Sequence, residues 1–275
     1  MRLLAALAAT GLAMAAGGAQ AASVEVKDAV ARVVVIPEAR SDIKVEFLTS
    51  NPSLPLKVRT LGDRVIVDGD LDRRIRSCHS NGTNIRVRVS GVGDVAYEDM
   101  PQIVIRTPKD VNFGAGGAVF GSIGKSTSLD LSNAGCGDWT VANVAGKMKI
   151  NQAGSGNTVT GSSGEAILRI AGSGDVRTGE VAGAMTADVA GSGDINTLSI
   201  SGPLNIKMAG SGDVRIAGGH ATEMSVSIAG SGDVSLDGVA DSLRARIAGS
   251  GDVHVKQVNG PISKAVVGSG GVSIG

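Results

Sequence analysis

The sequence predicts an all-β protein, a single-chain parallel β-solenoid with rungs of about 19 residues. The phrase Ala-Gly-Ser-Gly-Asp and close variants recur eight times, and the steps between their last residues are 19, 18, 19, 19, 20, 19 and 19 residues. Apolar and polar residues alternate between the copies, and no apolar stripe of helical period appears after residue 22. The last residues of the eight copies are Asp138, Asn157, Asp175, Asp194, Asp213, Asp233, Asp252 and Gly271.

Each repeat is expected to contain two short strands and a third extended segment. Counted from the last residue of the phrase, positions −9, −7 and −5 are apolar, as in Leu204, Ile206 and Met208, whereas Lys207 between them is polar. This period of two places one face of the strand in a core. Position +1 is apolar again and position +3 is apolar or threonine, so a second strand is expected to face the same core.

A single repeat of this kind cannot bury its apolar face, so successive repeats are expected to stack as parallel strands about 4.8 Å apart. The corners are short and contain no helix, and the crossover preference of parallel strands favours a right-handed coil. The outward column Arg169, Asp188 and Lys207 alternates in charge, which supports stacking through pairs between rungs. Asn133 and Gln152 take inward positions in the first two repeats, where stacked amides could form a polar ladder.

The N-terminus predicts an export signal. Arg2 precedes an apolar run from Leu3 to Ala16, and the segment 19–21, Ala-Gln-Ala, fits a small-x-small cleavage site. Residues 1–21 are therefore expected to be removed as a signal peptide, which places the mature chain in the periplasm or at the cell surface. No second long apolar segment follows, so no membrane span is expected in the mature chain.

Residues 22–111 and 112–275 differ in pattern. The first range has short strand candidates and five prolines without a fixed period, and it is expected to be an irregular β region that caps the solenoid. The strand candidates are residues 24–26, 32–36, 43–47, 56–59, 65–67, 85–89 and 103–105. The second range carries the solenoid repeats. No comparable cap follows the last repeat, where Lys264 takes an inward position. A partner or a second copy of the chain could cover this last rung, so an oligomer through it is possible.

The chain contains two cysteines, Cys78 and Cys136. In an exported protein an even pair favours a disulfide. Two free thiols are the alternative, because Cys136 takes the serine position of a repeat turn and could be a simple replacement. We predict the disulfide, which would stabilise the fold by about 4 kcal/mol in the chain-entropy model.

The repeated aspartates have two explanations. Glycine permits sharp turns, and Ser and Asp side chains can bond nearby backbone N–H groups, so turn chemistry accounts for the whole phrase. Alternatively, calcium could bind the column of carboxylates that stacking creates. The known calcium-binding nonapeptide repeats have a Gly-rich turn on both sides of the coil, whereas this chain has one Asp turn per repeat. We expect no cofactor, and the calcium candidates are Asp175, Asp194, Asp213, Asp233 and Asp252.

Composition and motifs argue against several other functions. Lys and Arg together number 26, as do Asp and Glu, so charge gives no general reason to expect nucleic acid as a partner. The three histidines, His79, His220 and His254, lack the spacing of metal ligands. No nucleophile elbow in a strand-to-helix context and no phosphate-binding loop occurs. We therefore predict no catalytic residue and no enzymatic activity.

The export signal, the irregular β region and the serial Gly-Ser-Gly-Asp-Val turns from Gly172 to Val253 resemble the bacterial head GIN domain family, named for auto-transporter adhesin heads. The resemblance covers essentially the whole mature chain. It implies a β-solenoid, an exported location and an adhesive role, and it brings no catalytic residues.

The expected function is that of a non-enzymatic exported module, structural or adhesive, at the surface. Its partner would be an envelope or surface protein or a polysaccharide. One alternative is a carbohydrate-active solenoid enzyme, whose acids and bases would lie among loops on one face. The other is a calcium-dependent binding module.

Overall fold

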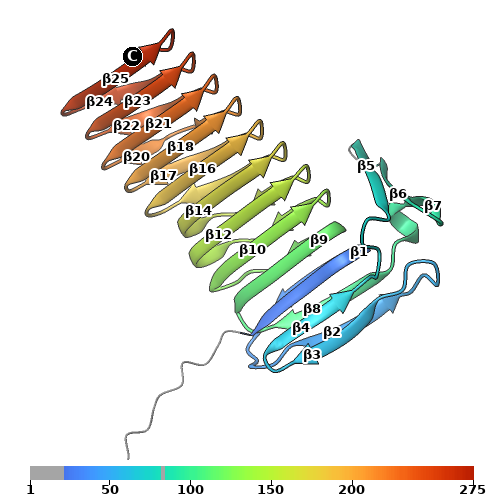
Figure 1. Cartoon of the computed structure of the whole chain (residues 1–275). Helices are drawn as coiled ribbons and strands as arrows, with labels where there is room; N and C mark the ends of the chain where they lie inside the picture. Colours follow the sequence, from blue (N-terminus) through green and yellow to red (C-terminus); the bar gives the residue numbers. More distant parts are fainter. Residues whose placement is uncertain (1–21, 82–83) are drawn as a thin grey trace, which may run out of the picture.

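The computed structural model describes residues 22–81 and 84–275, and the signal peptide predicted at residues 1–21 lies outside them. Figure 1 shows a row of stacked rungs with the N-terminal strands at one end and the C-terminal strands at the other. The predicted all-β fold and the parallel β-solenoid are both confirmed, because successive rungs pair in parallel along the row. Within the described ranges, no helix is long and apolar enough to cross a bilayer.

The regular rungs begin with β9 and end with β26. Their strands are β9 (Asp110–Ile123), β10 (Ser128–Gly135), β11 (Trp139–Val141), β12 (Val144–Gly154), β13 (Thr158–Thr160), β14 (Ser163–Gly172), β15 (Val176–Val181), β16 (Met185–Gly191), β17 (Ile195–Ser201), β18 (Leu204–Gly210), β19 (Val214–Ile216), β20 (Gly219–Ala221), β21 (Met224–Gly230), β22 (Val234–Ala240), β23 (Leu243–Gly249), β24 (Val253–Val258), β25 (Ile262–Gly268) and β26 (Val272–Ile274).

The register between rungs follows the sequence repeat. Leu204 of β18 pairs with Met185 of β16 on one side and with Met224 of β21 on the other. The predicted faces are confirmed, since Leu204, Ile206 and Met208 are buried and Lys207 is exposed. Equivalent side chains from each rung therefore form one continuous core along the solenoid.

The expected polar ladder is also confirmed near the start of this core. Asn133 Nδ2 donates to Gln152 Oε1 at 3.2 Å, and it also donates to the carbonyl oxygen of Gly137 at 2.8 Å. Thr158 Oγ1 donates to the same Gln152 Oε1 at 2.8 Å. Gln152 Oε1 thus accepts two buried donors, which helps the solenoid to tolerate this polar ladder, whereas Gln152 Nε2 is buried without a hydrogen-bond partner among the described residues.

The two glycines of the repeated phrase leave room for the neighbouring rung. Gly210 has φ +141°, and a methyl group on its Cα would overlap the carbonyl oxygen of Gly191 below it. A methyl group on Gly212 would overlap Gly193 in the same way. That Gly191 carbonyl oxygen accepts the backbone N–H groups of Ser211 at 2.9 Å and Gly212 at 3.3 Å. Glycine is therefore required at both positions by close stacking as well as by the turn.

The range 22–111 forms the N-terminal end. Its elements are β1 (Ser23–Pro37), β2 (Lys44–Thr49), β3 (Lys57–Leu61), β4 (Arg64–Asp68), β5 (Ile75–Asn81), β6 (Asn84–Val89), β7 (Gly93–Ala96), the short 3-10 helix η1 (Tyr97–Asp99) and β8 (Gln102–Thr107). The strand β1 is itself a rung, since it pairs in parallel with β9 from Ser23 to Val35. Its other edge pairs with β4 and β8, which extend the stack by one more layer.

Two antiparallel strands end the stack at this side. The strand β2 pairs with β8, and β3 pairs with β4. Because these pairings are antiparallel, the parallel stacking does not continue past them. The capping role expected of residues 22–111 stays a prediction, with which these pairings agree.

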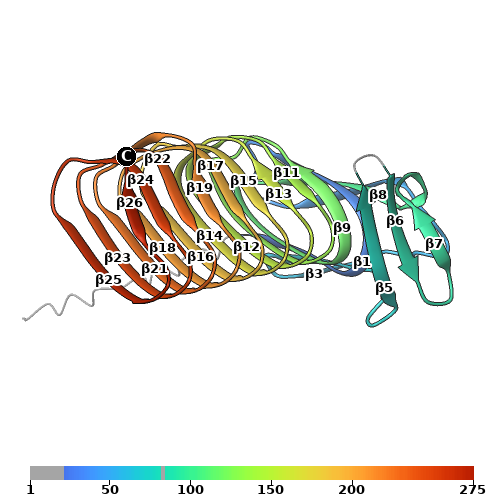
Figure 2. The same ribbon diagram turned by 90° about the horizontal axis from the view of Figure 1, so that it is seen from above.

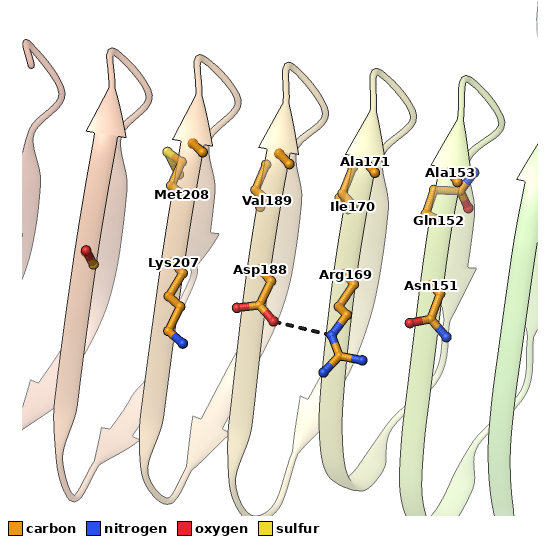
Figure 3. Close-up of a pocket in the computed structure, with 13 residues that line it drawn as sticks. Asn151, Gln152, Ala153, Arg169, Ile170, Ala171, Asp188, Val189, Lys207 and Met208 are labelled. Carbon is orange, nitrogen blue, oxygen red and sulfur yellow. Dashed lines mark hydrogen bonds and ion pairs between the residues drawn. The ribbon is translucent and has the colours of Figure 1, made fainter.

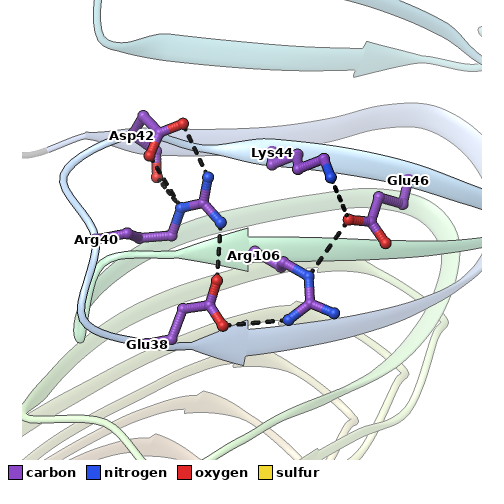
Figure 4. Close-up of polar contacts among 6 residues, drawn as sticks. All are labelled: Glu38, Arg40, Asp42, Lys44, Glu46 and Arg106. Atoms are coloured by element: carbon purple, nitrogen blue, oxygen red, sulfur yellow. Dashed lines mark hydrogen bonds and ion pairs between the residues drawn. The ribbon is translucent and has the colours of Figure 1, made fainter.

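A chain of ion pairs holds the connection between β1 and β2 (Figure 4). Its members are Glu38, Arg40, Asp42, Lys44, Glu46 and Arg106. Arg40 binds Glu38 and Asp42 at 2.8 Å each, and Arg106 of β8 binds Glu38 at 3.1 Å. The network therefore ties the β1–β2 connection to the strand beside it.

The strands β5, β6 and β7 form a separate three-stranded antiparallel sheet, named sheet B here. Figure 2 shows it beside the N-terminal end of the solenoid. Its inner side packs in a second hydrophobic cluster, where Val87 and Val89 meet Ala118 and Phe120 of β9. The predicted disulfide between Cys78 of β5 and Cys136 is present, with Cα atoms 6.2 Å apart.

The rung formed by β25 and β26 lies at the opposite end. Its apolar residues Ile262, Val266 and Ile274 are 46%, 38% and 45% exposed, and Lys264 is exposed as well. The expectation that a partner or a second copy of the chain covers this rung stays a prediction.

Candidate functional site

The repeated aspartates form a ladder along one corner of the solenoid. The Oδ1 atom of Asp175 accepts the backbone N–H of Asp194 at 3.0 Å, and Asp194 Oδ1 accepts that of Asp213 at 2.8 Å. The same bond runs from Asp213 to Asp233 at 2.9 Å and from Asp233 to Asp252 at 2.8 Å. Asn157 supplies the equivalent bond to Asp175 through its amide oxygen at 2.9 Å. Each side chain thus bonds the next rung rather than its own turn.

This ladder gives the five calcium candidates a structural role. One oxygen of each carboxylate already accepts a backbone N–H group, and the stacking of the rungs positions that oxygen beside its donor. Arg215 also binds the second oxygen of Asp213 at 2.6 Å. Among residues 22–81 and 84–275, no group of three or more His, Cys, Asp or Glu side chains is arranged to hold a metal ion.

A shallow groove lies on the outer face of the strands β12, β14, β16, β18 and β21, and we name it the lateral groove (Figure 3). Its volume is about 430 Å³. One outward column contributes Asn151, Arg169, Asp188, Lys207 and Ser227, and the neighbouring column contributes Ala153, Ala171, Ala190 and Ala209. The groove therefore has a floor of exposed alanine methyl groups beside a polar rim.

The polar rim is partly neutralised. Arg169 Nε lies 3.4 Å from Asp188 Oδ2 on the next strand, as the alternating charges of this column predict. Lys207 continues the column, and within the described part of the chain it forms no ion pair. Since both side chains of the Arg169–Asp188 pair are substantially exposed, their attraction is screened by water and the pair stays available for a ligand.

The repeat pattern predicts the charged column but not the groove. The alanines at position −4 belong to the repeated phrase, and their uniformity suggested turn chemistry alone. Their exposure depends on the strand continuing to Gly154, Gly172, Gly191 and Gly210 before the chain turns. The signal that could have found them is the fixed small residue at an outward position in every repeat.

The histidines do not gather into a catalytic group within the described residues. His220 Nε2 lies 2.8 Å from Asp241 Oδ1, and His254 Nδ1 lies 3.0 Å from Ser273 Oγ on a different part of the surface. His79 lies on β5, in sheet B. The arrangement around the lateral groove can hold a molecule through hydrogen bonds, ion pairs and apolar contact.

The stacked rungs and the elongated outer groove define a parallel β-solenoid with a lateral contact surface. Residues 199–274 of the chain match the model of the family described as "Putative auto-transporter adhesin, head GIN domain". The resemblance inferred from the repeated turns is therefore confirmed over residues 199–274.

Two solved structures share the fold. One is described as a putative adhesin from Parabacteroides distasonis ATCC 8503, with 13% identity, a TM-score of 0.57 and coverage of 93% of each chain. The other is described as a putative lipid binding protein from the same organism, with 18% identity, a TM-score of 0.52 and coverage of 92% of each chain. At these identities the similarity shows the fold alone. Among curated proteins, none matches this sequence.

Proposed function

We propose that this protein is a non-enzymatic adhesive module, exported to the periplasm or the cell surface, which holds an extended surface polymer in its lateral groove. The observation that carries the proposal is the continuity of the groove across five strands. With rungs about 4.8 Å apart, the groove is about 19 Å long. A surface of this length and shallow depth suits a linear polymer better than a compact small molecule.

The chemistry of the groove suits a polysaccharide chain. The alanine floor offers apolar contact to the C–H faces of sugar rings, and Asn151, Arg169 and Asp188 offer hydrogen bonds to hydroxyl groups. No aromatic residue lines the groove, so each contact is expected to be weak. Adhesion would then depend on several modules binding one surface at once, which multiplies weak affinities. A surface protein presenting an extended segment is the alternative partner.

The fold supports an adhesive role in a second way. The backbone ladder, the carboxylate ladder and the continuous core all run along the whole row of rungs. Such an array has few places where it can open locally, because each rung is held by both neighbours. The family description, which names adhesin heads, agrees with this role.

The proposal can be tested by filling the groove. Beads coated with the mature protein are passed over immobilised envelope polysaccharides and surface proteins, and the retained fraction is measured under flow. Ala190→Trp places an indole on the groove floor and should reduce retention severalfold. Ala248→Trp is the matched control, because it occupies the same column on β23, beyond the residues that line the groove. Equal retention of both variants and the parent protein on a surface that binds it would contradict the proposal.

A further inference from the structure

The outer face of sheet B carries four arginines, Arg74, Arg76, Arg86 and Arg88, and we name this surface the arginine face. Burial alternates strictly along β6: Val87 and Val89 are 0% and 1% exposed and face the second hydrophobic cluster, whereas Arg86 and Arg88 are exposed. The alternation of a strand therefore directs both arginines to the side away from the solenoid.

Arg74 and Arg76 extend this surface from the edge of β5. The guanidinium of Arg74 donates to the carbonyl oxygen of Ser90 at 3.0 and 3.1 Å. Arg76 Nε donates to the hydroxyl oxygen of the same Ser90 at 2.6 Å. Gly91, with φ +80°, lies directly beside the Arg74 guanidinium. The guanidinium groups of Arg74 and Arg76 are thus both held beside Ser90, and their acceptors are neutral oxygen atoms.

The positive charge of the arginine face is only partly balanced. Asp94 of β7 lies 2.9 Å from Arg88, and it is the one carboxylate that pairs with these four arginines among the described residues. Arg74, Arg76 and Arg86 have no carboxylate within 4.0 Å in residues 22–81 and 84–275. Asp72, two residues before Arg74, is exposed and lies 3.9 Å from Arg73, and Glu98 and Asp99 on the short helix after β7 are exposed as well.

We propose that the arginine face binds a linear anionic polysaccharide through its carboxylate or sulfate groups. Arginine presents a planar fork of donors that matches such oxyanions and stays charged at any working pH. Arg86 and Arg88 are two residues apart on one strand, so their Cα atoms are about 7 Å apart. This spread of guanidinium groups suits a polymer with repeated anions, which can contact several arginines at once.

The surroundings of the arginine face favour a soluble polyanion over a membrane or a nucleic acid. Among the described residues from Asp72 to Asp99, none is a large exposed hydrophobic side chain of the kind that inserts into a bilayer. Its one Phe, Tyr or Trp ring, Tyr97, lies under Arg32, whose guanidinium carbon is 5.3 Å from the ring centroid. The other aromatic group is the exposed imidazole of His79, which pairs with Arg86 across the sheet. A single imidazole does not provide the row of stacking platforms that single-stranded nucleic acids use.

This second surface does not depend on the lateral groove. The Cys78–Cys136 disulfide fixes β5 to the first regular turn, and Ser80 Oγ donates to Asp138 Oδ2 at 3.0 Å beside it. The arginine face is therefore held in a fixed position on the protein.

The test measures binding of the mature, disulfide-intact protein to immobilised heparin and polygalacturonate at about 50 mM salt, with neutral dextran as a blank. The variant R76Q/R86Q should bind both polyanions at least about tenfold more weakly, and the fall of its binding with salt should be shallower. The control R244Q/R246Q removes two exposed arginines from β23 and so changes the net charge equally. It should bind as the parent protein does, and all three proteins should melt at the same temperature.

Three results would overturn the proposal. The first is unchanged binding in R76Q/R86Q, and the second is an equal loss of binding in R244Q/R246Q. The third is binding to a DNA oligonucleotide or to vesicles of anionic phospholipid while heparin and polygalacturonate stay unbound, which would assign this face to another partner.

Discussion

The carboxylate of Asp213 accepts the backbone N–H of Asp233, one rung further along, at 2.9 Å. The same bond links Asp252 to Gly271 at 2.7 Å and Asp138 to Asn157 at 2.7 Å, so it spans all the regular turns. The aspartate of the phrase is therefore an acceptor that fastens each rung to the next. An amide oxygen can take the same place, as Asn157 does.

Two replacements of Asp213 distinguish the contribution of its hydrogen-bond acceptor from that of its negative charge. Asp213→Asn should keep the bond to Asp233 and change the free energy of unfolding by less than about 0.5 kcal/mol. Asp213→Ala removes the acceptor and should destabilise the protein by about 1 kcal/mol. Both variants lose the ion pair with Arg215, so the difference between them isolates the ladder bond. Denaturant unfolding measures both values, and equal destabilisation by the two changes would contradict this role.

Removal of divalent metal should leave the protein unchanged. The ladder already supplies a hydrogen-bond donor to each of the aspartates from Asp175 to Asp252, so calcium is not needed to hold the turns together. EDTA should not lower the melting temperature, and millimolar calcium should not raise it, because only a ligand of the native state adds stability. A clear rise with calcium that disappears in Asp213→Asn would instead support the calcium-dependent module.

Loss of the disulfide should act mainly on sheet B. The bridge joins residues 58 positions apart, and in the chain-entropy model its removal costs about 4 kcal/mol. Cys78→Ser with Cys136→Ser should lower the melting temperature and make β5 to β7 cleavable by protease before the rungs. The parent protein, unfolded without reductant, should show no free thiol. Two titratable thiols per chain would remove the basis of this prediction.

Acid should destabilise the N-terminal end. The hydrogen bond from Arg40 lowers the pKa of Asp42, the one from Lys44 lowers the pKa of Glu46, and the backbone N–H of Asp70 lowers the pKa of Asp68. A carboxyl with a lowered pKa in the folded state stabilises the fold above its unfolded pKa, about 4, and this stabilisation is lost as the pH falls through the lowered value.

The melting temperature should therefore fall as the pH is lowered below about 5, because these carboxyls take up protons in that range. The double variant Asp42→Asn with Glu46→Gln should show a shallower fall. An identical pH profile for the variant and the parent protein would show that these two carboxyls do not contribute.

The sequence predicted the rungs because their determinants are local. The alternation of Leu204, Ile206 and Met208 repeats in each unit, and stacking is the one arrangement that buries all these faces together. The contact between Asn133 and Gln152 was predictable from their shared position in the repeat. The disulfide was predictable because the exported chain has two cysteines.

The N-terminal end was less predictable because its pairings are distant along the chain. Val24 to Val26 and Arg32 to Ile36 were separate strand candidates, but one strand, β1, includes both and bends at a register shift between Val26 and Ala29. Its partner β9 lies far along the chain, and no local signal marks that pairing. The strands β5 and β7 were missed because their inner sides pack in the cluster that includes Ala118 and Phe120 of β9, which lie far along the chain.

The candidate site was predictable only in part. The charged column of Arg169 and Asp188 follows from the repeat, and their contact at 3.4 Å was expected. The sequence did not predict which backbone N–H each aspartate carboxylate accepts, because a bond within the turn and a bond to the next rung require the same residue type. Only the stacked geometry shows that the N–H being satisfied belongs to the next rung.

We propose that the protein holds a surface polymer without altering it. The most direct measurement incubates the mature protein with a polysaccharide that it retains, then follows the bound fraction, the length of the polymer and the number of reducing ends over time. We expect lasting retention, full-length polymer and no new reducing ends. Shortened polymer with new reducing ends, lost when His220 or Asp241 is replaced, would contradict it and favour the carbohydrate-active enzyme.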